Sequence, residues 1–351
     1  MRICYISRPG MGVITGRGNA GGGQLHSLRE AIELSKDKRF DVHMLIEGEK
    51  REQFRHKNIT VTAMKKRGLI GDLWETYTAI KKINADIFIS RMPTRLQIFT
   101  EAMFCRMLGK NYVYAEIINP YFILRRPMTL IGKCLYRAGL KLAAEVIANG
   151  KTIKEKLSKF TKRKIMVINV PMNLDGKKGM KRKYIIWVGR ADHLKRPDLF
   201  VKLAQQLPEE QFLMILSGKF EPPKEKNITV LKDIPYEKMN DYYASSKLIV
   251  QTSETEGFPN VFLEAWKNRT PVVSLFVNPD NVLTEHKTGL YSGTFEQLVK
   301  DVKLLLNNPE KWKECSENGH EYVIKEHDIS KIMEEYKKLF LKLADKNRES
   351  L

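Results

Sequence analysis

Short runs of apolar residues alternate with longer amphipathic stretches along the whole chain. This alternation predicts parallel strands joined by crossover helices, because a buried strand is apolar on both faces and a covering helix on one. In the first half, the predicted strands are Arg2–Ser7, Val42–Ile46, Ile59–Ala63, Ile87–Ser90, Tyr112–Ala115, Val146–Ala148 and Ile165–Ile168. The predicted helices of this half are Gln24–Ser35, Leu73–Ile83, Arg95–Leu108 and Leu130–Leu140.

The pattern pauses at residues 171–183, which hold Pro, Gly and basic residues without a hydrophobic period, and then restarts. Such a segment is typical of a linker between residues 1–170 and residues 184–328. The strands predicted after it are Ile185–Val188, Phe212–Ser217, Ile228–Leu231, Leu248–Gln251 and Pro271–Ser274, and the helices are Pro197–Gln206, Phe295–Leu306, Pro309–Val323 and a last amphipathic helix, Ile329–Ala344. The sequence therefore predicts two α/β domains.

Composition is ordinary for a globular protein, since 42% of the 351 residues are hydrophobic and 29% are charged. The four cysteines are scattered, which indicates neither a disulfide framework nor a zinc site and fits a reducing compartment. The apolar part of the N-terminus is too short for a signal peptide, and no apolar run is long enough to span a bilayer. These features predict a cytoplasmic location.

Positive charge is concentrated in the first half of the chain. Residues 1–170 hold 32 Lys and Arg against 14 Asp and Glu, whereas residues 171–351 hold 29 against 27. A one-sided basic field attracts anionic partners such as lipid headgroups, nucleic acid or phosphorylated acceptors. Arg125, Arg126, Lys133, Arg137 and Lys141 lie among apolar residues, which fits either an anionic membrane surface or a crossover helix with cations on its wet side.

The most informative stretch is S-E-T-E-G-F-P-N-V-F-L-E-A-W-K-N-R-T-P-V-V, residues 253–273. It predicts a strand, a tight turn containing Glu256 and Gly257, and a helix with Pro259 at its first position, where no backbone N–H is needed. The beginning of that helix favours an anion, while Glu256 and Glu264 offer carboxylates to hydroxyl groups. This combination predicts a ligand with hydroxyls and phosphates, such as a nucleotide sugar. The alternative is an ordinary helix with exposed acids.

A second candidate segment, W-V-G-R-A-D-H-L-K-R-P, follows the first strand of the second half. Arg190 and Lys195 lie between the end of this strand at Val188 and a helix that opens at Pro197. Two cations at the end of a strand suit a diphosphate. The alternative is a solvated basic loop.

The first strand of the chain is followed by a Gly-rich segment that contains Gly21, Gly22 and Gly23. Glycines between a strand and a helix let backbone N–H groups approach a ligand. The segment has neither a Gly-Lys-Ser/Thr ending nor the compact G-x-G-x-x-G spacing. A surface loop is therefore an equal alternative.

The motif E-G-F-P-x-x-x-x-E-A followed by P-V-V resembles that of retaining glycosyltransferases of the GT-B fold, glycosyltransferase family four. The resemblance implies two Rossmann-like doubly wound domains that face a central cleft, with residues 329–351 packing back on the first domain. It implies that Arg190 and Lys195 bind the diphosphate of a nucleotide sugar, Glu256 the sugar hydroxyls and Glu264 the ribose.

The donor-binding set implied by the resemblance is Gly21, Gly22, Gly23, Gly189, Arg190, Lys195, Ile234, Glu256, Gly257, Phe258, Pro259, Asn260 and Glu264. The expected catalytic residues are Arg190, Lys195, Glu256 and Glu116. No metal is expected, because the chain has no Asp-x-Asp to hold one against a diphosphate. Ile234 would pack on the nucleotide base, although an apolar residue before Pro also marks the end of a strand.

One residue departs from the family pattern. Many members have a His after the strand that matches Tyr112–Ala115, and here Glu116 is the nearest match. Either Glu116 takes over part of that role or the acceptor chemistry differs. The expected reaction is transfer of a sugar to a glycan or lipid-linked acceptor of the cell surface, with contact to an anionic membrane as a further expectation.

Two rival functions fit parts of the sequence. A GT-B sugar-nucleotide epimerase would need an acid/base set facing the sugar, which the sequence does not reveal. A non-catalytic basic protein that binds nucleic acid or membrane would fit the net charge of +20. Nucleic acid is not expected as a partner, because no recognisable module combines the basic residues with exposed aromatics.

Overall fold

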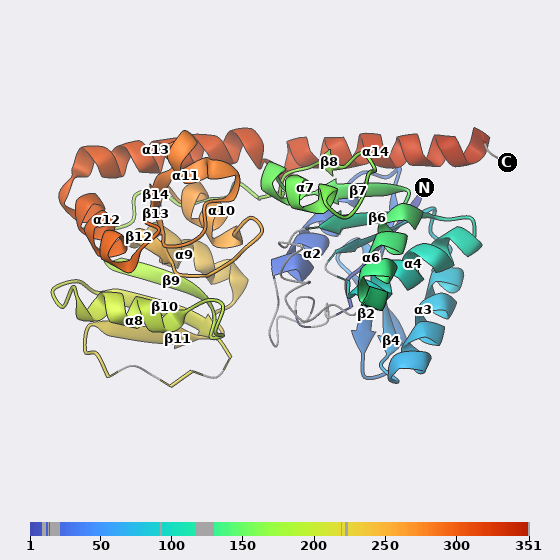
Figure 1. The fold of residues 1–351 in the computed structure, drawn as a ribbon, viewed down its shortest axis with the longest axis horizontal. Coiled ribbons are helices and arrows are strands. Elements are labelled where there is room, and N and C mark those ends of the chain that lie inside the picture. Colours follow the sequence, from blue (N-terminus) through green and yellow to red (C-terminus); the bar gives the residue numbers. More distant parts are fainter. Residues whose placement is uncertain are drawn as a thin grey trace. The chain divides into compact units, whose positions relative to one another are not determined.

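The computed structural model describes residues 1–8, 12, 14, 22–91, 93–116, 130–218, 220–221 and 224–349, with side chains up to residue 345 (Figure 1). It divides into two compact units. The first unit comprises Met1–Pro171 and Ile329–Leu351, and the second comprises Met172–Asp328. Each unit is built on one sheet with helices on both faces.

The sheet of the first unit has eight strands in the order β3-β4-β2-β1-β5-β6-β7-β8. The strands are β1 Arg2–Ile6, β2 Asp41–Gly48, β3 Glu52–His56, β4 Ile59–Lys65, β5 Ile87–Arg91, β6 Asn111–Glu116, β7 Glu145–Ala148 and β8 Met166–Val167. All pairs are parallel except β3 with β4. The edge strand β3 was not predicted, because its alternating half-exposed pattern lacks the apolar run of a buried strand.

Two helical layers cover this sheet. Helices α2 (Gly22–Leu34) and α14 (Ile329–Glu349) share one apolar cluster with Ile3 and Tyr5 of β1. Helices α3 (Leu69–Ile83), α4 (Arg95–Met107), α6 (Leu130–Leu142) and α7 (Lys151–Ser158) share the other with Cys4 and Ile6. Successive residues of a strand point to opposite faces, so the apolar run of β1 fills both layers.

The basic stretch around residue 133 forms part of a crossover helix. Helix α6 buries Tyr136, Gly139 and Leu140 and exposes Lys133 and Arg137. It packs tightly on α4, since a Cβ at Gly139 would lie 2.5 Å from Ile98 Cγ2. Arg125 and Arg126 lie outside the described residues.

The second unit has a parallel six-stranded sheet in the order β11-β10-β9-β12-β13-β14. Its strands are β9 Tyr184–Arg190, β10 Phe212–Ser217, β11 Ile228–Lys232, β12 Ser246–Gln251, β13 Val272–Ser274 and β14 Gly289–Tyr291. Its helices are α8 Pro197–Gln205, α9 Met239–Ala244, α10 Asn260–Lys267, α11 Val282–Glu285, α12 Phe295–Asn307 and α13 Pro309–Glu326, with short 3₁₀ turns at Tyr236–Lys238 and Pro279–Asn281. The elements α7, α9, α11 and β14 were not predicted, because they are too short to show a clear period.

A buried ion pair fastens α14 to the first unit. Arg91 at the end of β5 donates from Nη2 to both carboxylate oxygens of Glu30 on α2, at 2.6 and 2.8 Å, and to the Tyr336 hydroxyl on α14 at 2.5 Å. The Arg91 and Glu30 side chains are 4% and 0% exposed. Burial raises the pKa of Glu30, and the Arg91 guanidinium opposes that shift. Each side chain of the pair therefore stabilises the charge of the other, which burial alone would disfavour.

Breaking this pair from one side should destabilise the first unit strongly. We expect Arg91→Met or Glu30→Gln to lower the free energy of unfolding by about 3–5 kcal/mol, because the remaining charge stays buried without its partner. Tyr336→Phe should cost only about 1.5 kcal/mol, the contribution of one hydrogen bond to a charged group. Urea unfolding measures all three, and equal losses in all three variants would contradict a central role for the charge pair.

Candidate functional site

The candidate site of the second unit lies where two neighbouring parallel strands end. Strands β9 and β12 pair directly, and the loops that follow them hold the residues singled out by the sequence. Because the carboxyl ends of parallel strands share one edge of a sheet, segments about sixty residues apart in sequence meet there. Open α/β sheets bind their ligands at this edge.

Backbone and side-chain hydrogen bonds fasten the two loops to each other. Glu254 donates its backbone N–H to the Leu194 carbonyl at 2.8 Å. The Thr252 hydroxyl donates to the Lys195 carbonyl at 2.7 Å and accepts from the Trp187 indole at 2.9 Å. Thr252 and Trp187 are 0% and 1% exposed, so this chain of bonds is shielded from water. These hydrogen bonds therefore hold the backbone of Lys195 in place.

The side chains of Lys195 and Glu256 meet across the two loops. The Lys195 ammonium donates to Glu256 Oε1 in an ion pair, and the two side chains are 24% and 18% exposed. Asp192 steadies the loop by accepting the backbone N–H groups of Leu194 and Lys195 at 3.1 Å each. The structure thus brings together a cation and a carboxylate that the sequence predicted separately.

Arg190 supplies a second cation at the same edge. It is the last residue of β9, its side chain is 57% exposed, and its guanidinium lies 3.1 Å from the Asp192 carboxylate. An exposed guanidinium with one acidic neighbour can turn toward a phosphate at little cost. The edge therefore holds two cations with different freedom: Lys195 is held by Glu256, and Arg190 is open to solvent.

Gly189 makes room for the indole on which this arrangement depends. A Cβ at Gly189 would lie 3.0 Å from the Trp187 ring, closer than nearly all such contacts. A larger residue would push the ring that donates to Thr252. Gly189 therefore supports the loops through packing.

The turn after Glu256 is backed by aromatic rings. Phe258 is buried, and its ring centroid lies 4.8 Å from that of His327 and 6.4 Å from that of Trp266. Its side chain is thus part of the core of the second unit, which leaves its backbone and that of Gly257 at the turn. Glu264 lies on α10, the helix that directly follows this turn, and is 6% exposed.

The prediction for Pro259 was wrong by one position. Helix α10 begins at Asn260, and Pro259 is its N-cap residue with extended torsions, φ −66° and ψ 122°. Its carbonyl accepts a hydrogen bond from Phe262 N at 3.1 Å. The ring of Pro259 still suits this place, because a residue before the helix needs no intrahelical N–H bond.

Ile234 lies further along the same edge of the sheet. It is half-buried, follows Asp233 with its left-handed φ of 52°, and belongs to the loop after the edge strand β11. Two strands, β10 and β9, separate β11 from β12 in the sheet. Ile234 therefore lies at the carboxyl edge without contacting the ion pair in any interaction that the structure shows.

The remaining predicted residues belong to the first unit. Gly22 and Gly23 open α2, and Gly21 lies outside the described residues. Glu116 ends β6, is 0% exposed, and accepts a hydrogen bond from the Tyr114 hydroxyl. Burial raises the pKa of Tyr114 well above its ordinary value, and the Glu116 charge adds to the shift. Glu116 is thus a buried, hydrogen-bonded carboxylate.

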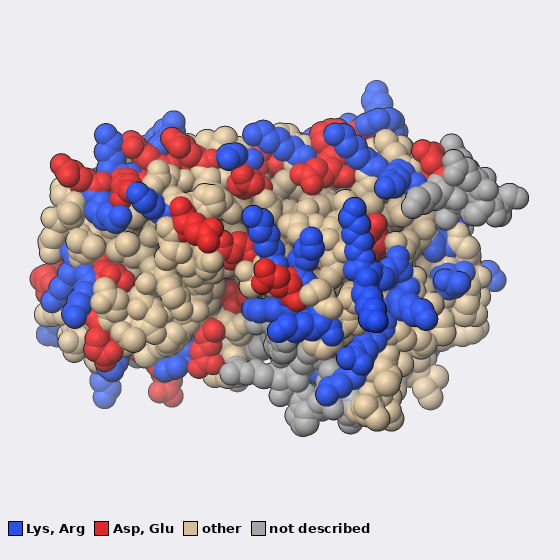
Figure 2. All heavy atoms as spheres, turned by 45° about the horizontal axis from the view of Figure 1, so that its top comes forward, with Lys and Arg blue, Asp and Glu red and all other residues tan. Residues whose placement is uncertain are grey.

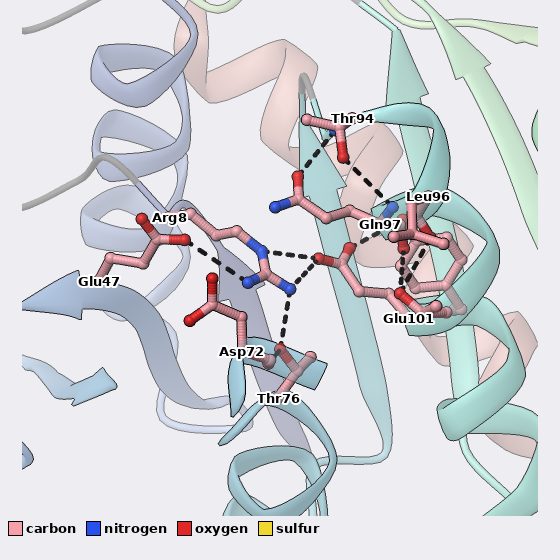
Figure 3. A network of polar contacts seen from close by, with 10 residues as sticks. Arg8, Glu47, Asp72, Thr76, Thr94, Leu96, Gln97 and Glu101 are labelled. Atoms are coloured by element: carbon pink, nitrogen blue, oxygen red, sulfur yellow. Dashed lines mark hydrogen bonds and ion pairs between the residues drawn. The ribbon is translucent and has the colours of Figure 1, made fainter. Parts of the chain in front are cut away.

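The carboxyl edge of the first sheet also holds Arg8, which follows β1 (Figure 3). Its guanidinium donates to Glu101 at 3.1 and 3.2 Å and to the Thr76 hydroxyl at 2.9 Å, and lies 3.5 Å from Glu47. Glu101 also accepts from the Tyr112 hydroxyl at 3.1 Å. These contacts link the end of β1 to α3 and α4.

Comparisons with known proteins identify the second unit. Residues 175–322 match the family model described as glycosyl transferases group 1. This match covers less than half of the chain and lies within the second unit. It is 30% identical over 198 residues to an uncharacterized glycosyltransferase of Haemophilus influenzae, a match that covers 54% of this chain and only 53% of that relative.

Other similar proteins are less identical in sequence but match over more of the chain. An α-1,4-N-acetylgalactosaminyltransferase of Campylobacter jejuni, named for a diNAcBac-PP-undecaprenol-linked glycan, is 23% identical over 76% of this chain and 77% of its own length. Sucrose-phosphate synthase of Thermosynechococcus elongatus superimposes with a TM-score of 0.81 at 16% identity, over 97% of this chain and 98% of that one. Anabaena HepE, solved with UDP and glucose, gives 0.74 at 15% identity over 97% and 100%.

These likenesses show the GT-B fold, as the sequence predicted. In the part of the chain that the structure describes, no helix is both long and apolar enough to cross a membrane. Within the same part, no three His, Cys, Asp or Glu side chains gather as a set that could hold a metal ion.

Sequence reasoning missed three residues that build the candidate site: Trp187, Asp192 and Thr252. Two of these residues could have been found from their positions in the sequence. Thr252 directly follows β12, and Asp192 lies between the two predicted cations. Their partners are set by the pairing of β9 with β12, which the sequence does not state.

Removing the Thr252 hydroxyl should loosen the support of Lys195. We expect Thr252→Val to lower the free energy of unfolding by about 1–3 kcal/mol, because it leaves the Trp187 indole and the Lys195 carbonyl without their shared partner. Thr252→Ser, which keeps the hydroxyl, is the matched control and should lose less than half as much. Urea unfolding measures both, and equal losses would show that the methyl group rather than the hydroxyl matters.

Proposed function

We propose that the chain is a retaining glycosyltransferase that moves a sugar from a nucleotide-diphosphate sugar to a glycan or lipid-linked acceptor. The observation that carries the proposal is the Lys195–Glu256 ion pair beside Arg190 at the carboxyl edge of β9 and β12. The match of residues 175–322 to the group 1 glycosyl transferases and the nucleotide-bound HepE neighbours support it. A UDP-sugar is the donor class these neighbours favour.

In this proposal the ion pair is the resting state of the donor site. An arriving diphosphate brings two or more negative charges and competes with Glu256 for the Lys195 ammonium. Arg190 is free to take a second phosphate oxygen. Glu256, released from Lys195, then accepts hydrogen bonds from the sugar hydroxyls, and Glu264 does the same for the ribose.

The chemical step breaks the bond between the anomeric carbon and the phosphate oxygen and forms one to the acceptor oxygen. The electron pair of the broken bond leaves on the diphosphate, where Lys195 and Arg190 stabilise the growing charge. The departing phosphate oxygen takes the proton of the acceptor hydroxyl, on the same face of the sugar, so the anomeric configuration is retained. The cations perform the charge neutralisation that a metal performs in other transferases, so we propose that no metal is required.

Glu116 has a different place in this proposal. A carboxylate that is fully buried and bonded by Tyr114 is held too firmly to exchange protons freely with an acceptor. We propose that it orients the end of β6 and the acceptor groups bound beyond it. Gly22 and Gly23, at the start of α2, would present backbone N–H groups in the same unit.

Donor binding should depend on Lys195 and not on a divalent metal. Ligand-detected NMR with UDP-, GDP-, ADP- and CMP-sugars should show one nucleotide class bound, unchanged by EDTA. Lys195→Ala and Arg190→Ala should each weaken that binding at least tenfold, because each removes one charge from the diphosphate site. Lys202→Ala, an exposed cation on α8, is the matched control. Binding of none of the four classes would overturn the proposal.

Substitutions of Glu256 and Glu264 should change different kinetic constants. Glu256→Gln should lower kcat roughly 100-fold, because it weakens contacts to the reacting sugar and leaves Lys195 without its counterion. Glu264→Gln should chiefly raise KM for the donor, since the ribose does not react. Initial rates of UDP release with a saturating acceptor measure both. Glu254→Gln, in the same loop, is the control, and a loss equal to that of Glu256→Gln would contradict the assigned roles.

A further inference from the structure

The beginning of α3 exposes more large apolar surface than a solvated helix needs. Leu69, Ile70 and Trp74 are 66%, 83% and 63% exposed. They lie within the first two turns, and Ile70 and Trp74, four residues apart, share one side of the helix. Among the described residues, Ile70 is the most exposed large hydrophobic side chain.

This apolar surface is framed by positive charge. Lys65, Lys66 and Arg67 lie between the end of β4 and Gly68, the N-cap of α3, and are all exposed. Two acids lie nearby. Glu75 is buried 2.6 Å from Arg51 and 2.8 Å from Arg67, and Asp72, in the first turn of α3, accepts the Arg67 backbone N–H at 2.7 Å. Lys and Arg gather over the first unit on the face that Figure 2 shows, while both signs alternate over the second.

Topology places this surface at the carboxyl edge of the first sheet. Only three residues separate the end of β4 from the start of α3, so the exposed turns lie at the carboxyl edge. The same edge holds Arg8, Glu116 and the start of α2. A partner docked on the first turns of α3 would therefore lie beside the edge at which a parallel α/β sheet binds its ligands.

We propose that Leu69, Ile70 and Trp74, with Lys65 and Lys66, form a docking surface for an anionic membrane. The apolar side chains enter the headgroup region, Trp74 takes the interfacial place that tryptophan prefers, and the lysines pair with anionic headgroups. The basic frame selects anionic lipid over a neutral apolar partner. The inference rests on the proposed function in one respect: a docked membrane brings a lipid-linked acceptor to the carboxyl edge of the first unit.

Trp74 also provides a direct readout. Trp187 and Trp266 are buried and Trp312 is half-buried, so Trp74 is the tryptophan most open to a vesicle. With the full chain, vesicles of phosphatidylglycerol and phosphatidylcholine should shift the emission to shorter wavelength, and brominated lipid should quench it. Pure phosphatidylcholine should do neither, and Trp74→Phe should abolish both effects.

Co-sedimentation with the same vesicles tests the residues. Ile70→Ser/Trp74→Ser and Lys65→Glu/Lys66→Glu should each weaken binding at least tenfold. The controls are Met107→Ser, an equally exposed apolar residue at the far end of α4, and Lys81→Glu/Lys82→Glu at the far end of α3. Controls that weaken binding as much as the test variants would overturn the assignment, as would an unchanged Trp74 spectrum.

Two further outcomes separate this inference from its rivals. A dimer in sedimentation velocity that Ile70→Ser/Trp74→Ser dissociates would replace the membrane with a second copy of the chain. Nucleotide-sugar binding and transfer to a short water-soluble acceptor should stay unchanged in the α3 variants. If those activities are absent in the unmodified chain while vesicle binding is intact, the proposed reaction fails and the docking surface stands.

Discussion

The contact between the loops after β9 and β12 is the constraint on which the candidate site depends. Parallel pairing places Arg190 and Gln251 at one edge, and the buried chain from Trp187 through Thr252 to the Lys195 carbonyl holds the two loops together. Only then can the Lys195 ammonium reach Glu256. In the proposed function, Glu256 keeps the Lys195 ammonium in place until the diphosphate of the donor arrives.

The two units use buried charge in different ways. In the first, Arg8 and Arg91 are almost fully buried, and each donates to a carboxylate and a hydroxyl. Such networks are costly to break and suit fixed structure. In the second, Lys195 and Glu256 keep part of their surface in water, and Arg190 keeps more than half. Partial exposure allows partners to be exchanged, as a binding site requires.

The two units also differ in their surface charge. The excess of Lys and Arg lies in the first half of the chain, whose unit also carries the apolar beginning of α3. The second unit has nearly equal numbers of basic and acidic residues, and the charged side chains of its candidate site lie at one edge of its sheet. In our proposals, the first unit therefore attracts anionic partners and the second unit binds the sugar donor. Both candidate surfaces lie at carboxyl edges, because helices that follow parallel strands begin there.

The sequence by itself determined the α/β class, most of the longer strands and helices, and the motif around Glu256, because hydrophobic period, Gly and Pro act locally. It could not give β3, whose exposed pattern resembles a loop, or the N-cap place of Pro259, which depends on one torsion angle. Only the tertiary structure decided that Lys195 pairs with Glu256, that Thr252 supports both loops, and that Glu116 is buried. It also decided that Trp74 is exposed near the start of α3. These facts depend on which strands are neighbours and which face of a helix is covered, and contacts between distant segments leave no local period in the chain.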